Sequence, residues 1–317
     1  MSFSYSVAIR TLGTAGEKFQ RLLDSLSVQT IAPEGIYVYI AEGYPLPKET
    51  INKEKYIYVK KGMLAQRALE YHEINSEYIL FTDDDLVLPP NAVELMYTLL
   101  FKYGGDVISP DIFNNAKRGH LSELLMTLSG RMRPRRDDGR WGYKVMANGG
   151  YSYNKSPKNE VYESQTNAGA CFLCKKNVFQ SVCLENELWV DRMPYPIGED
   201  QITYYKMFKR GLKVLTYYNH NIIHLDGGNN LTPEKEKIRL HGDLFFKIVF
   251  WHRFILKPDN SYISKAVDCF AIGYYLLFSI FISTIKFRFD ILAIKLRAMK
   301  DGVNFIQSDE YKNLPKI

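Results

Sequence analysis

Cysteine is scarce in this chain, with four residues in 317. Cys171 and Cys174 form a C-x-x-C, but no second pair and no histidine cluster at zinc spacing accompanies them. Because both lie in the apolar segment 170–174, we interpret them as small core side chains in a reducing compartment. A zinc or redox role is the less favoured interpretation.

Other common signals are also lacking. The first six residues do not contain the basic and apolar regions of a signal peptide, which predicts a protein that is made and kept in the cytosol. There is no internal repeat and no low-complexity tract. The net charge of +6 is modest for this length, and it indicates an anionic partner without identifying its class.

What the chain does have is a regular alternation of short apolar runs and amphipathic segments. This alternation predicts an α/β fold, with a mostly parallel sheet covered by helices on both faces. Between 114 and 165 the pattern breaks, and we interpret this stretch as functional with structure that the pattern does not place. Strands are expected at 7–10, 36–40, 57–59, 78–81, 106–109, 168–173, 213–217 and 221–224, and helices near 19–26, 63–74, 91–103 and 198–209.

Three consecutive carboxylates, Asp83, Asp84 and Asp85, follow the apolar run 78–81. They therefore lie at the carboxyl end of a predicted strand, the edge at which open α/β sheets bind ligands. Adjacent carboxylates repel one another unless a cation neutralises them, and Mg²⁺ typically takes one or two carboxylates plus substrate phosphates. The alternative is an acidic turn that caps the next helix.

The C-terminal part differs in composition from the rest. An aromatic and basic helix is predicted at 244–254, and the apolar run 269–285 is slightly short of the roughly 20 residues of a confident bilayer span. The stretch 286–300 interleaves basic with apolar residues, which suits a helix in an anionic membrane interface. A helical hairpin packed on the catalytic domain or on a second subunit is the alternative. We therefore divide the chain into residues 1–240 and a helical tail, 241–317.

Several further blocks occur in a fixed order. An opening strand at 6–11 precedes Leu-Asp-Ser-Leu and Gln-Thr within 22–30, then Ala-Glu-Gly at 41–43 and Gln-Arg-Ala at 66–68. The aspartate triplet, Gly-Glu-Asp at 198–200, Lys-Arg-Gly at 209–211 and His224 follow. From residue 6 to about 227, this order resembles the family 2 glycosyltransferases, which have the GT-A fold and the DxD motif.

The resemblance implies roles for the site residues. Asp85 would be a metal ligand, Asp83 would contact the metal or the nucleoside, and His224 would complete the shell of a divalent cation, Mn²⁺ or Mg²⁺. Asp83 and Asp84 are also implied nucleotide contacts, because three aspartates in a row allow two registers of the motif. Further implied nucleotide contacts are Arg10, Arg67 and Glu42, the last standing where the family usually has Asp.

Asp200 is the implied catalytic base, with Glu199 as the alternative. The family inverts the anomeric centre by direct displacement, which needs one base and no covalent nucleophile. The resemblance thus implies an inverting enzyme that moves sugar from a UDP- or dTDP-sugar to a glycan or polyprenyl-diphosphate-linked acceptor, in cell-surface polysaccharide synthesis. It would be cytoplasmic and peripheral at the inner face of the cell membrane, with no nucleic-acid partner and with a homo-oligomer possible.

Two other functions are weighed against this one. A nucleotidyltransferase would be expected to carry a Gly-rich, Lys-containing phosphate loop after the first strand, and the segment 11–16 lacks the lysine and the spacing. A non-catalytic sugar-nucleotide-binding relative would be expected to lose Asp200 or the triplet, and both are present.

A run of arginines lies in the irregular segment. Arginine binds diphosphate through its planar fork, so the run could recognise such a group on an acceptor. A solvated basic loop is the favoured interpretation. The run comprises Arg131, Arg133, Arg135, Arg136 and Arg140.

Overall fold

The computed structural model describes residues 3–112, 118–218, 220–225, 232–258 and 261–317. Residues 226 and 227, the last of the segment that resembles the family, lie outside these ranges. Within the described residues, the main sheet contains β1 (Tyr5–Thr11), β2 (Ile36–Ala41), β3 (Glu54–Val59), β4 (Tyr78–Asp83), β6 (Val107–Pro110), β10 (Val161–Glu163), β11 (Cys171–Lys175) and β12 (Val214–Tyr217).

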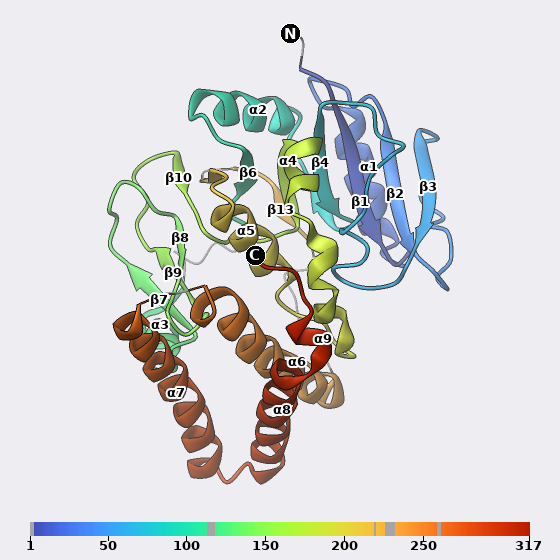
Figure 1. Cartoon of the computed structure of the whole chain (residues 1–317). Coiled ribbons are helices and arrows are strands. Elements are labelled where there is room, and N and C mark those ends of the chain that lie inside the picture. The colour runs from blue at the N-terminus through green and yellow to red at the C-terminus, as the bar shows by residue number, and fades with distance from the viewer. Residues whose placement is uncertain (1–2, 113–117, 219, 226–231, 259–260) are drawn as a thin grey trace.

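The strand order in this sheet is β10-β12-β6-β11-β4-β1-β2-β3 (Figure 1). Neighbours are parallel except that β11 runs antiparallel to β4 and β6, and β10 antiparallel to β12. The predicted α/β fold with a mostly parallel central sheet is therefore confirmed.

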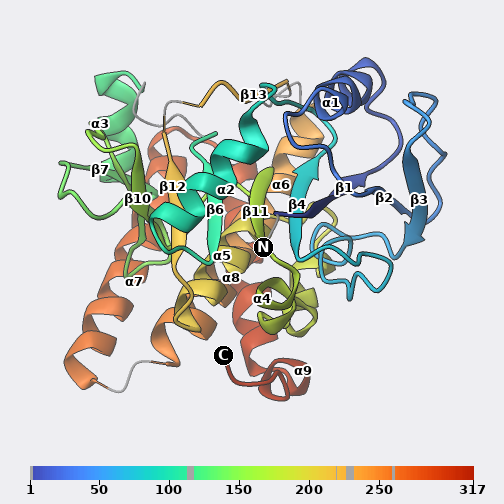
Figure 2. The same ribbon diagram turned by 90° about the horizontal axis from the view of Figure 1, so that it is seen from above.

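Alternation along the strands separates two hydrophobic cores. In β1, for example, Val7 and Ile9 belong to one core and Ala8 to the other. The first core is covered by α1 (Glu17–Ser27) and α2 (Ala92–Lys102), and the second by α4 (Lys176–Ser181), α5 (Glu199–Lys209) and α6 (Pro233–Phe250). Figure 2 shows α1 and α4 on opposite sides of β4.

The helix predicted at 63–74 is wrong, because this segment forms only turns. The backbone amides of Leu64 and Ala65 donate to the carboxylate of Asp191, at 3.1 and 2.8 Å, and Tyr71 has a φ of 51°. A side chain from a distant segment thus caps the first turn, and the positive φ prevents the helix from continuing.

The irregular segment contains more structure than its composition indicates. After residues 113–117, which lie outside the described ranges, α3 (His120–Leu128) leads into a separate sheet. This sheet has the order β7-β9-β8, from β7 (Met132–Arg135), β8 (Tyr143–Val145) and β9 (Tyr151–Asn154). A short pair, β5 (Leu86–Val87) with β13 (Ile223–His224), lies beside the end of β4.

The predicted C-terminal helices are present, and they pack on the α/β body. The predicted division at residue 240 lies inside α6, which continues as a π-helical turn, Trp251–Leu256. Phe245 and Phe250 of α6 share the second core with Phe305 of α8 (Phe289–Gln307) and Tyr311 of α9 (Asp309–Lys312). In the same region, Arg253 pairs with the fully buried Glu187 at 2.6 Å.

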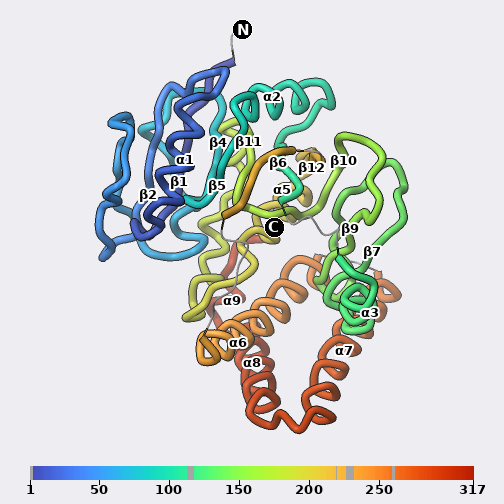
Figure 3. Tube along the Cα trace, turned by 180° about the vertical axis from the view of Figure 1, so that it is seen from behind, coloured from blue at the N-terminus to red at the C-terminus, as the bar shows by residue number. Residues whose placement is uncertain are grey.

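The helix α7 (Tyr262–Ile285) is the exception to this packing. It forms a hairpin with α8 that projects away from the sheet (Figures 1 and 3). Its length and composition would allow it to cross a membrane, and 22% of its most apolar window is buried. Most of its apolar side chains are therefore at least partly exposed on the surface of the protein.

Candidate active site

Two parallel strands bring the first pair of site residues together. Arg10 of β1 lies in register with Asp83 of β4. The Arg10 guanidinium donates to both carboxylate oxygens, at 2.5 and 3.1 Å, and Arg67 donates to one of them at 3.0 Å. Although burial opposes the effect, Arg10 and Arg67 hold the pKa of Asp83 below its ordinary value. The partners of Asp83 are therefore arginines, and both of its oxygens are engaged.

Asp85 meets His224 because β13 pairs antiparallel with β5, which brings His224 opposite Leu86. The His224 Nε2 is 3.1 Å from one oxygen of Asp85. The other oxygen, Oδ1, is buried and has no hydrogen-bond partner among the described residues. A buried carboxylate oxygen without a partner is unfavourable unless a donor or a cation reaches it.

This donor set fits a divalent cation in part. A carboxylate and an imidazole are ligands that Mn²⁺ accepts, and diphosphate oxygens and water would have to supply the rest. Within the described residues there is no group of three or more His, Cys, Asp or Glu side chains placed to hold a metal by themselves. Among the residues that the structure describes, Asp85 and His224 are thus the pair best placed to hold the cation.

Asp84 has a different partner from Asp85. Its carboxylate accepts a hydrogen bond from the Thr11 hydroxyl. Burial raises the pKa of Asp84 to about 6. The hydrogen bond from Thr11 opposes this rise, and the negative charges of Asp83 and Asp85 add to it. Partial protonation of Asp84 near neutral pH relieves the repulsion within the triplet.

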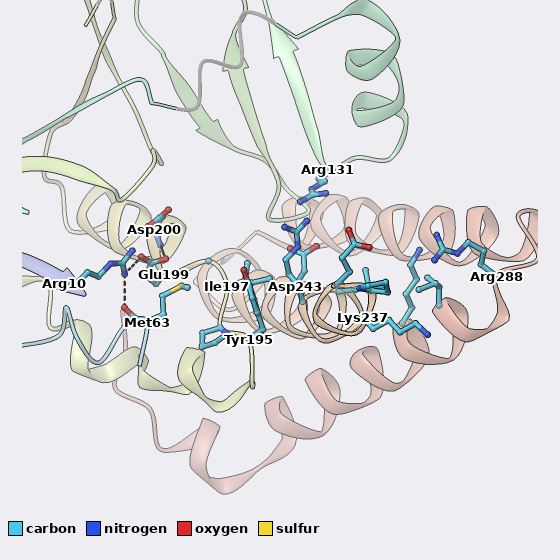
Figure 4. A pocket seen from close by; sticks show the side chains of 18 residues that line it. Arg10, Met63, Arg131, Tyr195, Ile197, Glu199, Asp200, Lys237, Asp243 and Arg288 are labelled. Atoms are coloured by element: carbon cyan, nitrogen blue, oxygen red, sulfur yellow. Dashed lines mark hydrogen bonds and ion pairs between the residues drawn. The ribbon is translucent and has the colours of Figure 1, made fainter. Parts of the chain in front are cut away.

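Two adjoining cavities meet at this site. The smaller, of about 470 Å³, is lined by the aspartate triplet and by residues of the loop after β1. The larger, of about 640 Å³, is lined by Glu199, Asp200 and residues of α6 and α8 (Figure 4). Arg10, Met63 and Pro196 line both. The triplet and the second carboxylate pair therefore face neighbouring spaces, with Arg10 between them.

The second carboxylate pair begins helix α5. Gly198, the residue before it, has a φ of 89°, and a Cβ there would lie 2.2 Å from the Phe246 ring. Only glycine therefore allows α5 to start this close to α6. This position of the start of α5 places Glu199 Oε1 2.5 Å from Arg10 Nη1.

Glu199 and Asp200 differ in basicity. Although burial opposes it, Arg10 and then Arg67 lower the pKa of Glu199. Burial, followed by the charge and the hydrogen bond of Glu199, raises the pKa of Asp200 well above its ordinary value. The proton that this pair retains therefore resides on Asp200, which is the stronger base once it is ionised.

Asp200 also depends on a residue that the sequence analysis missed. A Cβ at Gly169 would lie 2.0 Å from Asp200 Oδ1 and 2.8 Å from Arg67 Nη1. Glycine at this position lets both side chains approach the backbone before β11. The run Ala168-Gly169-Ala170 ahead of a strand is the signal that could have indicated such a close approach.

The remaining candidates are placed as follows. Arg67 is 2% exposed and reaches Asp83, as described above. Glu42 follows β2, is exposed, and is not among the residues that line either cavity. Of the arginine run, Arg131 lines the larger cavity, whereas Arg135 pairs with Asp138 and Arg140 with Glu163.

Comparison with known proteins gives a limited result. No protein-family model matches this chain, and no curated protein matches it. Among solved structures, it is similar to GalNAc-T7 with UDP, GalNAc and Mn²⁺, at 12% identity and a TM-score of 0.48, over 86% of this chain and 54% of that one. It is also similar to S. aureus TarS 1–349 in complex with UDP-GlcNAc, at 14% identity and a TM-score of 0.41, over 86% and 72%.

This chain thus spans about half the length of the GalNAc-T7 chain that it matches. The roles of the site residues rest on the geometry described above.

Proposed function

We propose that this protein is an inverting, metal-dependent glycosyltransferase of the GT-A type. The observation that carries the proposal is the pair of adjoining cavities, one beside Asp85 and His224 and the other beside Asp200. Glycosyl transfer needs this arrangement, because negative charge develops on a diphosphate while an acceptor hydroxyl loses its proton.

The donor, a UDP- or dTDP-sugar, would occupy the smaller cavity. Lys18 and Lys61 line that cavity and add positive charge near the diphosphate. Mn²⁺ or Mg²⁺, bound to Asp85 and His224, would neutralise charge on the leaving group. Arg10 and Arg67 hold Asp83 in place, so the wall between the cavities is preorganised by ion pairs.

The acceptor hydroxyl would approach Asp200 in the larger cavity. Asp200 accepts the hydroxyl proton as the new bond to the anomeric carbon forms, and the bond to the diphosphate breaks on the opposite face. The configuration is therefore inverted, and no covalent enzyme intermediate is needed. Glu199, held by Arg10, keeps Asp200 basic through its own negative charge.

We also propose that the protein works at the inner face of the cell membrane, in the synthesis of a surface polysaccharide. Large apolar side chains of α7 are exposed, as are leucines of α3, and Tyr274 of α7 donates to the Leu128 carbonyl at 2.8 Å. The two helices therefore present neighbouring apolar surfaces. The basic Lys286 and Lys300 belong to the same hairpin, which suits an anionic bilayer.

A panel of sugar nucleotides, tested with Mn²⁺ and with a chelator, examines the catalytic proposal. We expect one UDP- or dTDP-sugar to raise the melting temperature with Mn²⁺ and not with the chelator. Slow release of nucleoside diphosphate should accompany binding. Release of pyrophosphate from a nucleoside triphosphate and a sugar phosphate would instead identify a nucleotidyltransferase, and binding without turnover of any acceptor would identify a non-catalytic relative.

A further inference from the structure

The backbone carbonyl of Gly149 connects two helices of the candidate site. Gly149 lies in the turn between β8 and β9 and has a φ of 74°. Its carbonyl accepts one hydrogen bond from the Gln201 side chain, at 2.8 Å, and another from Lys247 Nζ, at 2.9 Å. Gln201 belongs to α5 and Lys247 to α6. A carbonyl oxygen has two lone pairs, so these two donors engage both of them.

The first of these hydrogen bonds acts on the start of α5. Gln201 directly follows Asp200 in the first turn of that helix, so its hydrogen bond restrains the backbone that carries the carboxylate. The same turn begins at Gly198, where a Cβ would lie 2.2 Å from the Phe246 ring of α6. The start of α5 is therefore placed by α6 in two ways, through this close packing and through the shared carbonyl.

The turn that carries the shared carbonyl is itself held firmly. The Gly149 amide donates to the Met146 carbonyl at 2.8 Å, and the Met146 amide donates to the Gly150 carbonyl at 2.7 Å. The Asn148 side chain donates to the Gly130 carbonyl at 2.7 Å and accepts from the Gly150 amide at 2.8 Å. The carbonyl is therefore a fixed point to which α5 and α6 are both tied.

Lys247 is an unusual donor for this place, because it is only 6% exposed. Its ammonium lies over the Tyr275 ring of α7, 5.4 Å from the centroid. Burial lowers the pKa of Lys247 to about 8; the negative charge of Asp243 opposes this fall, and the positive charge of Arg131 adds to it. An apolar side chain would fill the same space without the cost of burying a charge. Packing alone therefore does not account for a lysine here, whereas its hydrogen bond to the shared carbonyl does.

We propose that Lys247 is a positioning residue for glycosyl transfer, which together with Gln201 fixes the start of α5 and hence the carboxylate of Asp200. This inference rests on the proposed function, in which Asp200 is the base. Lys247 is not among the residues that line either cavity, so it acts through the Gly149 carbonyl. A base works only from a narrow range of positions, so a small shift of α5 lowers the rate of the chemical step.

The first test replaces the lysine, in the full chain, by an unbranched apolar side chain. Lys247→Met keeps most of the packing and removes the ammonium. We expect kcat for hydrolysis of the sugar nucleotide that turns over in the panel above to fall roughly tenfold, the scale of one lost charge-assisted hydrogen bond. Affinity for UDP with Mn²⁺ should be unchanged. Lys176→Met is the matched control, because Lys176 Nζ donates to the Ile74 carbonyl at 2.7 Å and lines neither cavity, so its kcat should equal that of the unaltered protein.

The pH profile separates positioning from a general loss of stability. In the unaltered protein, the Lys247 ammonium loses its proton as pH rises through its pKa of about 8, and the neutral amine is a weaker donor to the carbonyl. We therefore expect kcat to fall through this range. Lys247→Met has no such proton to lose and should lack this limb, whereas Lys176→Met should keep it.

The route through the shared carbonyl is tested by Gln201→Met. Its kcat should also fall, and Lys247→Met should add no further loss in the double variant, because α5 is then no longer tied to the carbonyl. Hydrogen exchange gives a readout without turnover. The Ile202 amide, which donates to the Gly198 carbonyl at 3.0 Å, should exchange faster in both single variants and not in Lys176→Met.

Three results would overturn the inference. One is a kcat for Lys247→Met that is no lower than that for Lys176→Met. Another is a double variant whose loss equals the product of the two single losses, which would mean that Lys247 and Gln201 act independently. The third is a loss of UDP affinity that matches the loss of kcat, which would indicate general damage to the site.

If Lys247→Met is too unstable to assay, Gln201→Met, at a half-buried residue, still decides: unchanged kcat in that variant would overturn the inference. If no sugar nucleotide turns over even with the unaltered protein, the proposed function fails. Exchange at Ile202 then still shows whether Lys247 holds the start of α5, and an unchanged exchange rate in Lys247→Met would mean that it does not.

Discussion

Arg10 connects the two halves of the site through one guanidinium. It contacts Asp83 at 2.5 Å and Glu199 at 2.5 Å, so it neutralises one carboxylate on each side. It also decides which acid of the second pair is ionised, because its charge favours ionised Glu199 and leaves the proton on Asp200. Among these residues, Asp200 is therefore the one whose chemistry can be tested most directly.

Asp200→Asn keeps the size of the side chain and removes its basicity. We expect kcat to fall by roughly 10²–10⁴, with little change in donor affinity, because the base acts only in the chemical step. Nucleotide release in the presence of acceptor measures kcat, and titration with UDP and Mn²⁺ measures donor binding. Asp309→Asn, at an exposed carboxylate, should leave both unchanged.

The pH dependence gives a second readout for Asp200. Its pKa is raised, so kcat should increase as pH rises through a value well above the roughly 3.9 of a free aspartate. Between the unfolded and the native pKa, the native state binds the proton and the unfolded chain does not. The contribution of Asp200 to the free energy of unfolding therefore decreases as pH rises through this window. A kcat profile without this acidic limb would argue against Asp200 as the base.

Gly169 provides a test of how Asp200 is positioned. In Gly169→Ala, the added Cβ would lie 2.0 Å from Asp200 Oδ1, so the carboxylate must move. We expect a large loss of kcat and about 1–3 kcal/mol of destabilisation from overpacking. Gly273→Ala is the control, because a Cβ there meets nothing within 4 Å. Unchanged kcat in Gly169→Ala would show that the position of Asp200 is not critical.

The cation site can be examined without turnover. Asp85→Ala removes one of the two described residues best placed to hold the metal, together with the buried oxygen that lacks a partner among the described residues. We expect Mn²⁺ to stop raising the melting temperature in the presence of UDP, because His224 and the diphosphate alone bind the cation weakly. A variant that keeps the full Mn²⁺ response would contradict the assignment of Asp85.

At the scale of elements, strands and helices with a clean apolar period were predictable. β1, β2, β4, α1, α2 and α5 lie where the pattern predicts them. The segment 63–74 was not predictable, because its first turn is held by Asp191, more than 115 residues away in sequence, and the positive φ of Tyr71 prevents the helix from continuing. The sequence also does not predict that β11 runs antiparallel to its neighbours, because an apolar run is equally compatible with a parallel and an antiparallel strand.

The candidate site was predictable to a similar degree. The order of motifs indicated Asp83, Asp85, Asp200 and His224, and the structure brings Asp85 and His224 together and Asp200 close to Arg10. The sequence could not indicate that α8 reaches the cavity of Asp200. That contact depends on how α8 packs on α6, and the spacing of apolar residues along either helix does not reveal how the two helices pack.

Packing of α8 gives the prediction at this scale. Phe305 is 6% exposed and contacts the aromatic rings of Trp189 and Phe245. Phe305→Ala should cost about 3–5 kcal/mol in the free energy of unfolding, through lost burial and the cavity left behind. Phe287→Ala, at a residue 80% exposed, should change it by less than about 0.5 kcal/mol. Denaturant unfolding measures both, and equal values would show that α8 does not stabilise the body.

At the scale of the whole molecule, the C-terminal helices contribute both to the larger cavity and to an exposed apolar surface. α6 and α8 line the larger cavity, and α7 and the turn before α8 carry exposed apolar side chains. Attachment of the hairpin to a bilayer would therefore bring the far end of the cavity to the membrane surface. Membrane binding and access to the larger cavity would then depend on the same helices.

Flotation with vesicles tests this arrangement. We expect the protein to bind vesicles that contain phosphatidylglycerol, and high salt to weaken binding only partly, because salt screens the basic residues and leaves burial of apolar side chains intact. In Phe270→Ser with Leu277→Ser, two exposed residues of α7 lose their apolar character, so binding should fall while UDP affinity stays unchanged.

The matched control for this experiment is Phe101→Ser on α2, at a residue 81% exposed, which should bind vesicles as well as the unaltered protein does. Equal loss in the control would mean that exposed apolar residues bind lipid non-specifically. If the unaltered protein instead remains a soluble dimer beside the vesicles, and the double variant is a monomer, α7 is a subunit interface. In that case the hairpin buries its apolar side chains against a second copy, and the membrane proposal is wrong.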